Sequence, residues 1–193
     1  MRPGVILTSL FLVLAGCGVP IQSEPVPIAS GAVPTRLQGS PGAPTVAPSA
    51  TPGRPAVQVN FVRDDKLVTL VRDTPASTPA ERLTAVVDAL LAGPTENEQA
   101  IGITTALPPG IGLSVVDVQG NRVDLQLSGE TDGRSATENV LAVGQIVLSV
   151  TALPTVDQVS FSRDGAPVEA LLADGALTAE PLTASDYEAL RTR

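Results

Sequence analysis

Histidine is absent from this 193-residue sequence, and cysteine occurs once, at Cys17. These absences exclude a Ser-His-Asp triad, a histidine-assisted cysteine nucleophile and the usual zinc ligation. A single cysteine also means that no disulfide within the chain stabilises it. The sequence implies no cofactor and no metal ion.

Basic residues are also scarce. Lysine and arginine together number 12 against 20 aspartate and glutamate residues, which gives a net charge of −8. Nucleic acids are bound through clustered lysine and arginine side chains that release counterions. A nucleic-acid partner is therefore not expected, and the acidic surface favours a partner protein with a basic face.

Aromatic side chains are few, and tryptophan is absent. Clefts that bind sugars usually contain aromatic platforms. We therefore interpret two candidate carboxylate pairs, Glu130 with Asp132 and Asp64 with Asp65, as solvated turn charges. If either pair acted as acid and base in glycosidic cleavage, the protein would be a cell-wall glycan hydrolase. A hydrolase of this kind, or a cell-wall-binding accessory protein, is the alternative function.

A second candidate, a serine nucleophile beside a carboxylate, has a simpler explanation. Ser160 and Ser162 lie close to Asp164 in the sequence. A strand followed by a turn places these residue types in that order without any catalytic role.

The N-terminal hydrophobic run, Val5 to Ala15, is too short for a membrane-spanning helix, which needs about 20 apolar residues. A preceding Arg2 and small residues at its end are typical of a secretory signal peptide. The tetrad Leu14-Ala15-Gly16-Cys17 resembles the lipobox of bacterial lipoproteins. This resemblance implies that residues 1–16 are removed and that Cys17 carries a diacylglyceryl anchor on the extracytoplasmic face of the cell membrane.

The segment that follows, residues 17–55, is rich in proline, glycine, alanine, serine and threonine. It buries too little apolar surface to offset its chain entropy, so we predict a disordered tether. As a flexible coil it would hold the following domain, residues 56–193, roughly 35 Å from the membrane.

The domain is predicted to begin with a hairpin, followed by a helix. Strand-like alternation over 57–61 and an apolar run over 67–71 flank a turn at Asp64-Asp65. Thr78, Pro79 and Glu81 then form the N-terminal signature of a helix that ends at Gly93-Pro94. Its apolar residues have helical spacing and are expected in the core: Leu83, Val86, Val87, Leu90 and Leu91.

The same order of elements recurs. Strands are predicted over 113–118 and 123–127, and Ser135 with Glu138 begins a second helix, expected from Thr137 to about Leu153. That helix has no charge after Glu138, so we expect it to be the more buried of the two, with Val147 in the core. A third hairpin is predicted over 159–172, and a short helix over 185–190.

These elements predict an α+β fold with one mixed or antiparallel sheet built from ββα units. The order contains an embedded βαββαβ unit, as in ferredoxin-like sheets. Two long helices are expected on one face of the sheet, because a helix and a sheet each need a partner for their apolar side. A short C-terminal helix completes the prediction.

Several runs resemble the GerM or GerMN domain, also called the sporulation and spore germination domain. They are 61–64 (FVRD), 90–94 (LLAGP), 105–110 (TALPPG), 123–125 (VDL), 145–147 (QIV) and 151–154 (TALP). The likeness covers nearly all of 57–172, and many such domains occur in lipoproteins of Gram-positive and actinobacterial type. It brings no catalytic residue with it.

The sequence thus favours a non-enzymatic binding or assembly module of the cell envelope. Its expected partners are the membrane, through Cys17, and another envelope protein or like domains. We expect docking through an exposed strand edge or helix face, with the first and last hairpins near the edges of the sheet.

Overall fold

The computed structural model describes residues 55–130 and 133–192. The expected signal peptide, the lipobox residues Leu14, Ala15 and Gly16, the anchor Cys17 and nearly all of the expected tether lie outside the described residues. Asp132 also lies outside them. In the described part of the chain, no helix is both long and apolar enough to span a bilayer.

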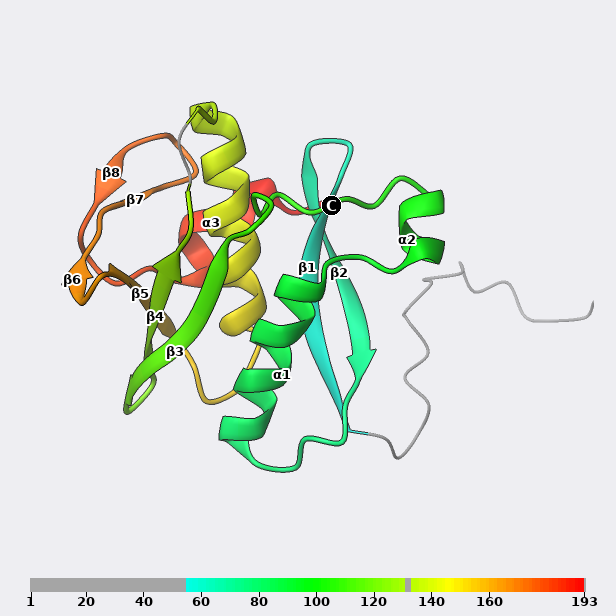
Figure 1. The fold of residues 1–193 in the computed structure, drawn as a ribbon, viewed down its shortest axis with the longest axis horizontal. Coiled ribbons are helices and arrows are strands. Elements are labelled where there is room, and N and C mark those ends of the chain that lie inside the picture. Colours follow the sequence, from blue (N-terminus) through cyan, green and yellow to red (C-terminus); the bar gives the residue numbers. More distant parts are fainter. Residues whose placement is uncertain (1–54, 131–132, 193) are drawn as a thin grey trace, which may run out of the picture. The chain divides into compact units, whose positions relative to one another are not determined.

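The described chain alternates strands and helices (Figure 1). The strands are β1 (Ala56–Arg63), β2 (Lys66–Asp73), β3 (Gly112–Gln119), β4 (Arg122–Ser128), β5 (Gln158–Arg163), β6 (Ala166–Pro167), β7 (Ala170–Leu171) and β8 (Leu177–Thr178). The helices are α1 (Pro79–Ala92), α2 (Glu96–Ala100), α3 (Ala136–Val150) and the 3-10 helix η2 (Ala184–Leu190). The α+β class is therefore confirmed.

The strands form three sheets, so the expected single sheet is wrong. β1 and β2 make a separate antiparallel pair, β3-β4-β5-β6 make a mixed four-stranded sheet, and β7 pairs with β8. The βαββαβ order is present in the chain. Strand β4 precedes α3 and β5 follows it, and the two strands pair in parallel, but β2 does not join their sheet. The ferredoxin-like arrangement is therefore not formed.

The strands are divided into separate sheets because of the edge of β1 that faces away from β2. Backbone groups of Asn60 and Val62 at this edge are bonded to other elements. The Asn60 amide donates to Ser149 Oγ of α3 at 2.8 Å, and Val62 exchanges two backbone hydrogen bonds with Thr104. A strand with its outward donors and acceptors satisfied in this way cannot accept a further strand there. Helix α3 consequently lies between the β1–β2 pair and the four-stranded sheet (Figure 1).

The turns of both main hairpins follow from their sequences. Asp64 and Asp65 have φ values of 52° and 56°, the backbone of a two-residue primed turn that matches the twist of its strands. Asp164 and Gly165 adopt the same left-handed region at the end of β5. The predicted turns are confirmed, and the Asp64-Asp65 pair has a structural role.

Both long helices begin at the predicted capping boxes. Thr78 Oγ1 accepts the Glu81 amide while the Glu81 carboxylate accepts the Thr78 amide, and Ser135 and Glu138 make the same exchange. Each box satisfies amides that have no partner within the helix. The expected boundaries differ only slightly, since α3 ends at Val150 instead of about Leu153.

Helix α3 is the more buried helix, as predicted. Ten of its residues are buried, including Val147 at 0% exposure, whereas α1 buries Leu83, Val86, Val87 and Leu90. Leu91 was expected in the core of α1 but is 42% exposed. At about 3.6 residues per turn, Leu91 lies at one edge of the apolar stripe of α1 and not at its centre, so its side chain reaches solvent.

A close contact explains one residue choice in α3. A Cβ atom at Gly144 would lie 2.9 Å from Leu190 Cδ1 and 3.0 Å from a ring carbon of Tyr187. The glycine therefore allows η2 to approach the helix backbone. Tyr187 is fully buried there, and its hydroxyl donates to the Leu171 carbonyl at 2.7 Å.

The third unit differs from its prediction. The strand expected to return over 168–172 is not formed over that range. Two short strands stand in its place, β6, which precedes the range and pairs with β5, and β7, which lies within it and pairs with β8. The C-terminal helix is confirmed as the 3-10 helix η2. Helix α2 was not predicted, although Thr95 and Glu98 form a third capping box at its start.

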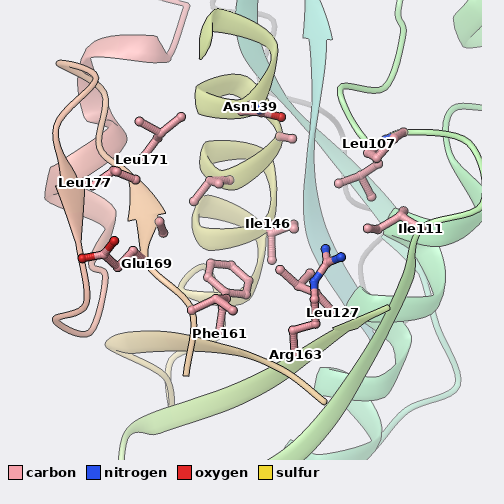
Figure 2. A pocket seen from close by; sticks show the side chains of 15 residues that line it. Leu107, Ile111, Leu127, Asn139, Ile146, Phe161, Arg163, Glu169, Leu171 and Leu177 are labelled. Carbon is pink, nitrogen blue, oxygen red and sulfur yellow. The ribbon is translucent and has the colours of Figure 1, made fainter. Parts of the chain in front are cut away.

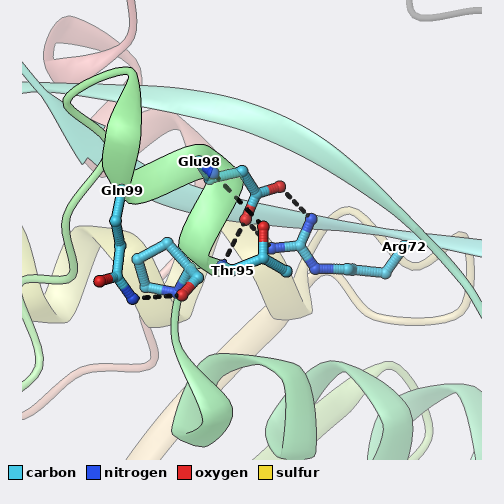
Figure 3. Close-up of polar contacts among 5 residues, drawn as sticks. Arg72, Thr95, Glu98 and Gln99 are labelled. Carbon is cyan, nitrogen blue, oxygen red and sulfur yellow. Dashed lines mark hydrogen bonds and ion pairs between the residues drawn. The ribbon is translucent and has the colours of Figure 1, made fainter.

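Helix α2 is fastened to β2 by a bidentate ion pair (Figure 3). Two nitrogen atoms of the Arg72 guanidinium each lie 2.6 Å from one oxygen of Glu98. Arg72 also lies over the Phe61 ring, 5.4 Å from its centroid. The Arg72 guanidinium is the main cause that lowers the pKa of Glu98, and the Thr95 amide adds to the effect.

Leu90 provides a test of the packing of α1. It is 1% exposed and belongs to the main hydrophobic cluster. Leu90→Ala is expected to lower the free energy of unfolding by about 2–5 kcal/mol, from lost apolar burial and the cavity that remains. Leu91→Ala is the control, and chemical denaturation of both variants is the measurement. Equal losses in the two variants would contradict the facing of α1.

The Arg72–Glu98 pair predicts a pH dependence of stability. Glu98→Gln is expected to cost about 1–3 kcal/mol near neutral pH, whereas Glu96→Gln, an exposed change in the same helix, is expected to cost much less. Because the folded-state pKa of Glu98 is lowered, the pair stabilises the protein above the ordinary value of 4.5, and this contribution is lost as the pH falls below it. Unfolding curves of wild type and Glu98→Gln should therefore converge in acid.

Candidate functional site

Of the carboxylates singled out in the sequence, Asp64, Asp65 and Glu130 lie in the described part of the chain. Asp64 and Asp65 form the β1–β2 turn, and Glu130 is exposed, while its expected partner Asp132 is not described. Within the described residues, 55–130 and 133–192, no three or more cysteine, aspartate or glutamate residues are placed to hold a metal ion.

The four described carboxyl groups with a shifted pKa are all shifted downward, and each shift has a structural cause. Amides of Thr78 and Ser77 bring the pKa of Glu81 to about 2. The Ser135 amide lowers the pKa of Glu138, and the Gln119 side-chain amide is the main cause for Asp117. Glu98, the fourth, is held by Arg72. A general acid in glycoside cleavage needs the opposite, a raised pKa.

Ser160 and Ser162 are half-buried residues of β5. Together with Asp124 and Gln126 of β4 they line a hollow of about 460 Å³ that the segment 178–182 also borders. Their side chains alternate with those of Val159 and Phe161, which are buried. The strand interpretation of these serines is therefore confirmed.

A mainly apolar hollow of the described domain is a groove along α3, here called the α3 groove (Figure 2). Its volume is about 320 Å³. Its floor consists of Asn139, Ala142, Val143 and Ile146, which follow one another at helical spacing and so form one stripe of α3. Strands β4 and β5 line this groove only through Leu127 and through Phe161 and Arg163.

Two walls enclose the α3 groove. One consists of the segment 107–111 and the other of the segment 168–171 with Leu177, while Leu127 and Phe161 close one end. Figure 2 shows Leu107 and Ile111 on one side of the helix and Leu171 and Leu177 on the other. Leu177 is 61% exposed, so this wall presents apolar surface to solvent.

A second hollow lies on the other side of the segment 107–111 and is here called the α1 groove. It has a volume of about 540 Å³ and is lined by residues 90–94 at the end of α1 and by 103–105 and 107–111. Leu107, Pro108 and Ile111 line both grooves. Leu91, whose side chain is exposed, lines the α1 groove.

The ridge between the grooves is held in place by a buried glutamine of α3. Gln145 is 0% exposed, and its Oε1 accepts the Ala106 amide at 2.7 Å, while its Nε2 donates to Thr105 Oγ1 at 3.1 Å. Arg134 donates to the Ala106 carbonyl at 2.6 Å. Because unpaired polar groups are costly in a protein interior, these bonds fix the position of the ridge.

Polar groups are confined to the margins of the α3 groove. They are Asn139 at one end of the floor, Arg163, whose guanidinium donates to the Gly129 carbonyl at 3.0 Å, and the exposed Glu169. Figure 2 places Glu169 at the edge of the groove. This arrangement suits the apolar part of a ligand, because burying its surface is favourable while its polar parts stay at the rim.

Sequence reasoning did not find either groove. One signal was available, because a glutamine in an otherwise apolar helix indicates a buried hydrogen-bonding role for Gln145. The other lining residues are mostly aliphatic, and several of them, such as Leu107, Ala142 and Ile146, are buried like core residues, so only the fold shows that they border a hollow.

The runs that suggested a family resemblance also meet in space. Residues 90–94 and most of 105–110 line the α1 groove, and Gln145 supports the ridge beside it. The resemblance therefore includes the residues that form the candidate site.

Solved structures share this fold. The tandem GerMN domains of the sporulation protein GerM from Bacillus subtilis match with a TM-score of 0.52 and 18% identity over 77% of this chain. This chain spans 51% of that tandem protein. The first GerMN domain of the same protein matches with a TM-score of 0.54 and 15% identity, over 68% of this chain and 98% of that one.

A protein from Clostridium perfringens that is described as a proposed lipoprotein also matches, with a TM-score of 0.48 and 16% identity over 72% of this chain and 91% of that one. No curated protein sequence is significantly similar to this chain.

The model of the Germane family, described as sporulation and spore germination, matches residues 50–169. This match covers more than half of the chain and includes β1 to β6, both long helices and the ridge between the grooves. The chain therefore belongs to the sporulation and spore germination family, and its described part has the fold of a GerMN domain.

Proposed function

We propose that this protein is a non-enzymatic binding module of the cell envelope, tethered to the extracytoplasmic face of the membrane through Cys17. Its sporulation and spore germination domain docks to another envelope protein. The observation that carries this proposal is the mainly apolar α3 groove, together with the α1 groove, whose lining is mixed, on the other side of the 107–111 ridge. Exposed concave apolar surface is typical of sites that bind a partner.

The structure changes the expected place of docking. The edge of β1 was one candidate, but Val59, Asn60 and Phe61 are each 0% exposed and the edge amides are bonded to other elements. The last hairpin contributes differently, because 168–171 forms a wall of the α3 groove. The docking surface is therefore assigned to the grooves instead of to a strand edge.

The lipid anchor at Cys17 would keep the docking surface close to the membrane. A diacylglyceryl group has two acyl chains, and each buried CH₂ contributes about 0.8 kcal/mol, so two chains suffice for stable attachment. A domain confined near the membrane has a raised local concentration there, so a shallow groove with a modest affinity is enough for function.

The anchor prediction is tested by Cys17→Ser. The variant is expected to keep its signal peptide and to lack diacylglyceryl, because the acceptor sulfur is missing. Mass spectrometry of the N-terminal peptide from the membrane fraction is the measurement. An unmodified Cys17 thiol in the wild-type protein would refute lipid anchoring.

The docking prediction is tested by photo-cross-linking in intact cells. A photoreactive amino acid at Leu91, in the α1 groove, or at Val143, in the α3 groove, is expected to form an adduct with one envelope protein. The same probe at Val118, which is 52% exposed on β3 and lines neither groove, is the control. Ala142→Leu should suppress the adduct at Val143, because a larger side chain fills the groove floor.

Two outcomes would contradict the proposal. Adducts of equal yield at Val118 and at the groove positions would mean that the grooves are not the docking surface. Peptidoglycan digestion by the purified protein that is lost in Glu130→Gln or Asp132→Asn would instead establish the glycan hydrolase alternative.

A further inference from the structure

We infer that the α3 groove binds an aliphatic side chain from a short, extended, positively charged segment of the partner protein. This inference rests on the proposed function and specifies the chemistry of the partner. It follows from the size of the groove, from the residues that line it and from the charge of the domain around it.

The size of the groove limits the ligand to a short segment. At about 320 Å³ it is near the lower end of ligand sites, which are about 300–1,000 Å³. The floor from Asn139 to Ile146 extends over about 10 Å, at 1.5 Å per helical residue. About three residues of an extended chain cover that length, at roughly 3.3 Å per residue.

The lining selects an aliphatic side chain. Ala142, Val143 and Ile146 form most of the floor, and Leu107 and Leu171 lie on opposite walls. A polar side chain placed among these groups would lose its hydrogen bonds to water without replacement, which is unfavourable. Polar and charged groups of the partner must therefore lie at the rim.

The charge of the domain selects a basic segment. Of the 12 basic residues, Arg2, Arg36, Arg54 and Arg193 lie outside the described residues, whereas only Glu24 and Asp132 of the 20 acidic residues do. The described domain is therefore more acidic than the whole chain. One acidic residue, the exposed Glu169, and one basic residue, Arg163, line the groove, so the negative charge that favours a basic segment is that of the domain as a whole.

The same charge argues against other occupants of the groove. An anionic lipid surface and a second copy of this acidic domain would both bring negative charge toward a domain that is itself negatively charged. A segment with lysine or arginine on either side of its aliphatic residue is electrostatically complementary to the net charge of the domain.

The test uses detergent-purified full-length protein and a synthetic probe peptide with a central leucine between two valines and two lysines at each end. Isothermal titration calorimetry is expected to show saturable binding. Replacing the leucine by serine, or all lysines by glutamate, should each weaken binding by about tenfold or more. Binding should also weaken as salt is raised, because the charges of the domain and of the peptide are screened.

Matched protein variants locate the binding. Val143→Trp fills the floor of the groove and is expected to abolish peptide binding, whereas Val118→Trp, an equal change on exposed β3, should not alter it. Glu169→Lys should weaken the lysine peptide and favour the glutamate peptide. Circular dichroism and thermal unfolding confirm that each variant is folded before its titration is interpreted.

Equal affinity for the lysine and glutamate peptides, or unchanged binding by Val143→Trp, would overturn the inference. Concentration-dependent self-association that Val143→Trp abolishes would instead identify a second copy as the occupant. The docking proposal and the charge assignment can be tested apart from each other. Groove-specific adducts in cells with an acidic partner segment would support docking and refute only the charge assignment.

Discussion

The burial of α3 is the constraint on which the rest of the structure depends. This helix is enclosed by the β1–β2 pair, the four-stranded sheet, α1 and η2, so its polar side chains need partners within the protein. Ser149 accepts the Asn60 amide of β1 and donates to the Gln145 carbonyl at 2.6 Å, and Gln145 holds the ridge. One buried helix thus fixes both a strand and the loop that separates the two grooves.

This arrangement has a consequence for the sheets. Because α3 and Thr104 use the outward backbone groups of β1, the first hairpin is isolated from the strands that follow. The space between the hairpin and the four-stranded sheet is filled by the helices and by the segment 103–111. The ends of that segment are packed or bonded, but its middle forms the ridge. The α3 groove lies beside this ridge, along the stripe of α3 from Asn139 to Ile146.

The described carboxylates of the domain include two groups, those that stabilise local structure and those that are exposed without an internal hydrogen bond. The carboxylates of Glu81, Glu98 and Glu138 accept amides at helix starts, and Glu98 also holds Arg72, so these negative charges stabilise local structure. Exposed carboxylates such as Glu169 have no such internal function at a groove that is mainly apolar. A groove with an apolar floor, bordered by one acid, Glu169, and one base, Arg163, suits binding better than proton transfer, for which a carboxyl group must be held near its point of protonation.

The sequence by itself determined what depends on neighbouring residues in the chain. The two predicted capping boxes, the Asp64-Asp65 turn, the alternation of β4 and the buried character of α3 are all confirmed, because each is set within a few residues by backbone hydrogen bonding or by periodicity. The class and the family followed from the order of these elements. The N-terminal lipobox, outside the described residues, stays a prediction of the same local kind.

The tertiary structure alone decided which groups remain without a partner. That β1 is closed to further strands follows from Ser149, 89 residues away, and that Leu91 is exposed follows from where the core ends. The grooves are made of aliphatic residues that the sequence could not distinguish from core residues, since hydrophobic attraction has no direction and burial depends on the surrounding elements. Local bonding is encoded next to the residue that uses it, whereas an uncovered surface is defined only when every other element has been placed.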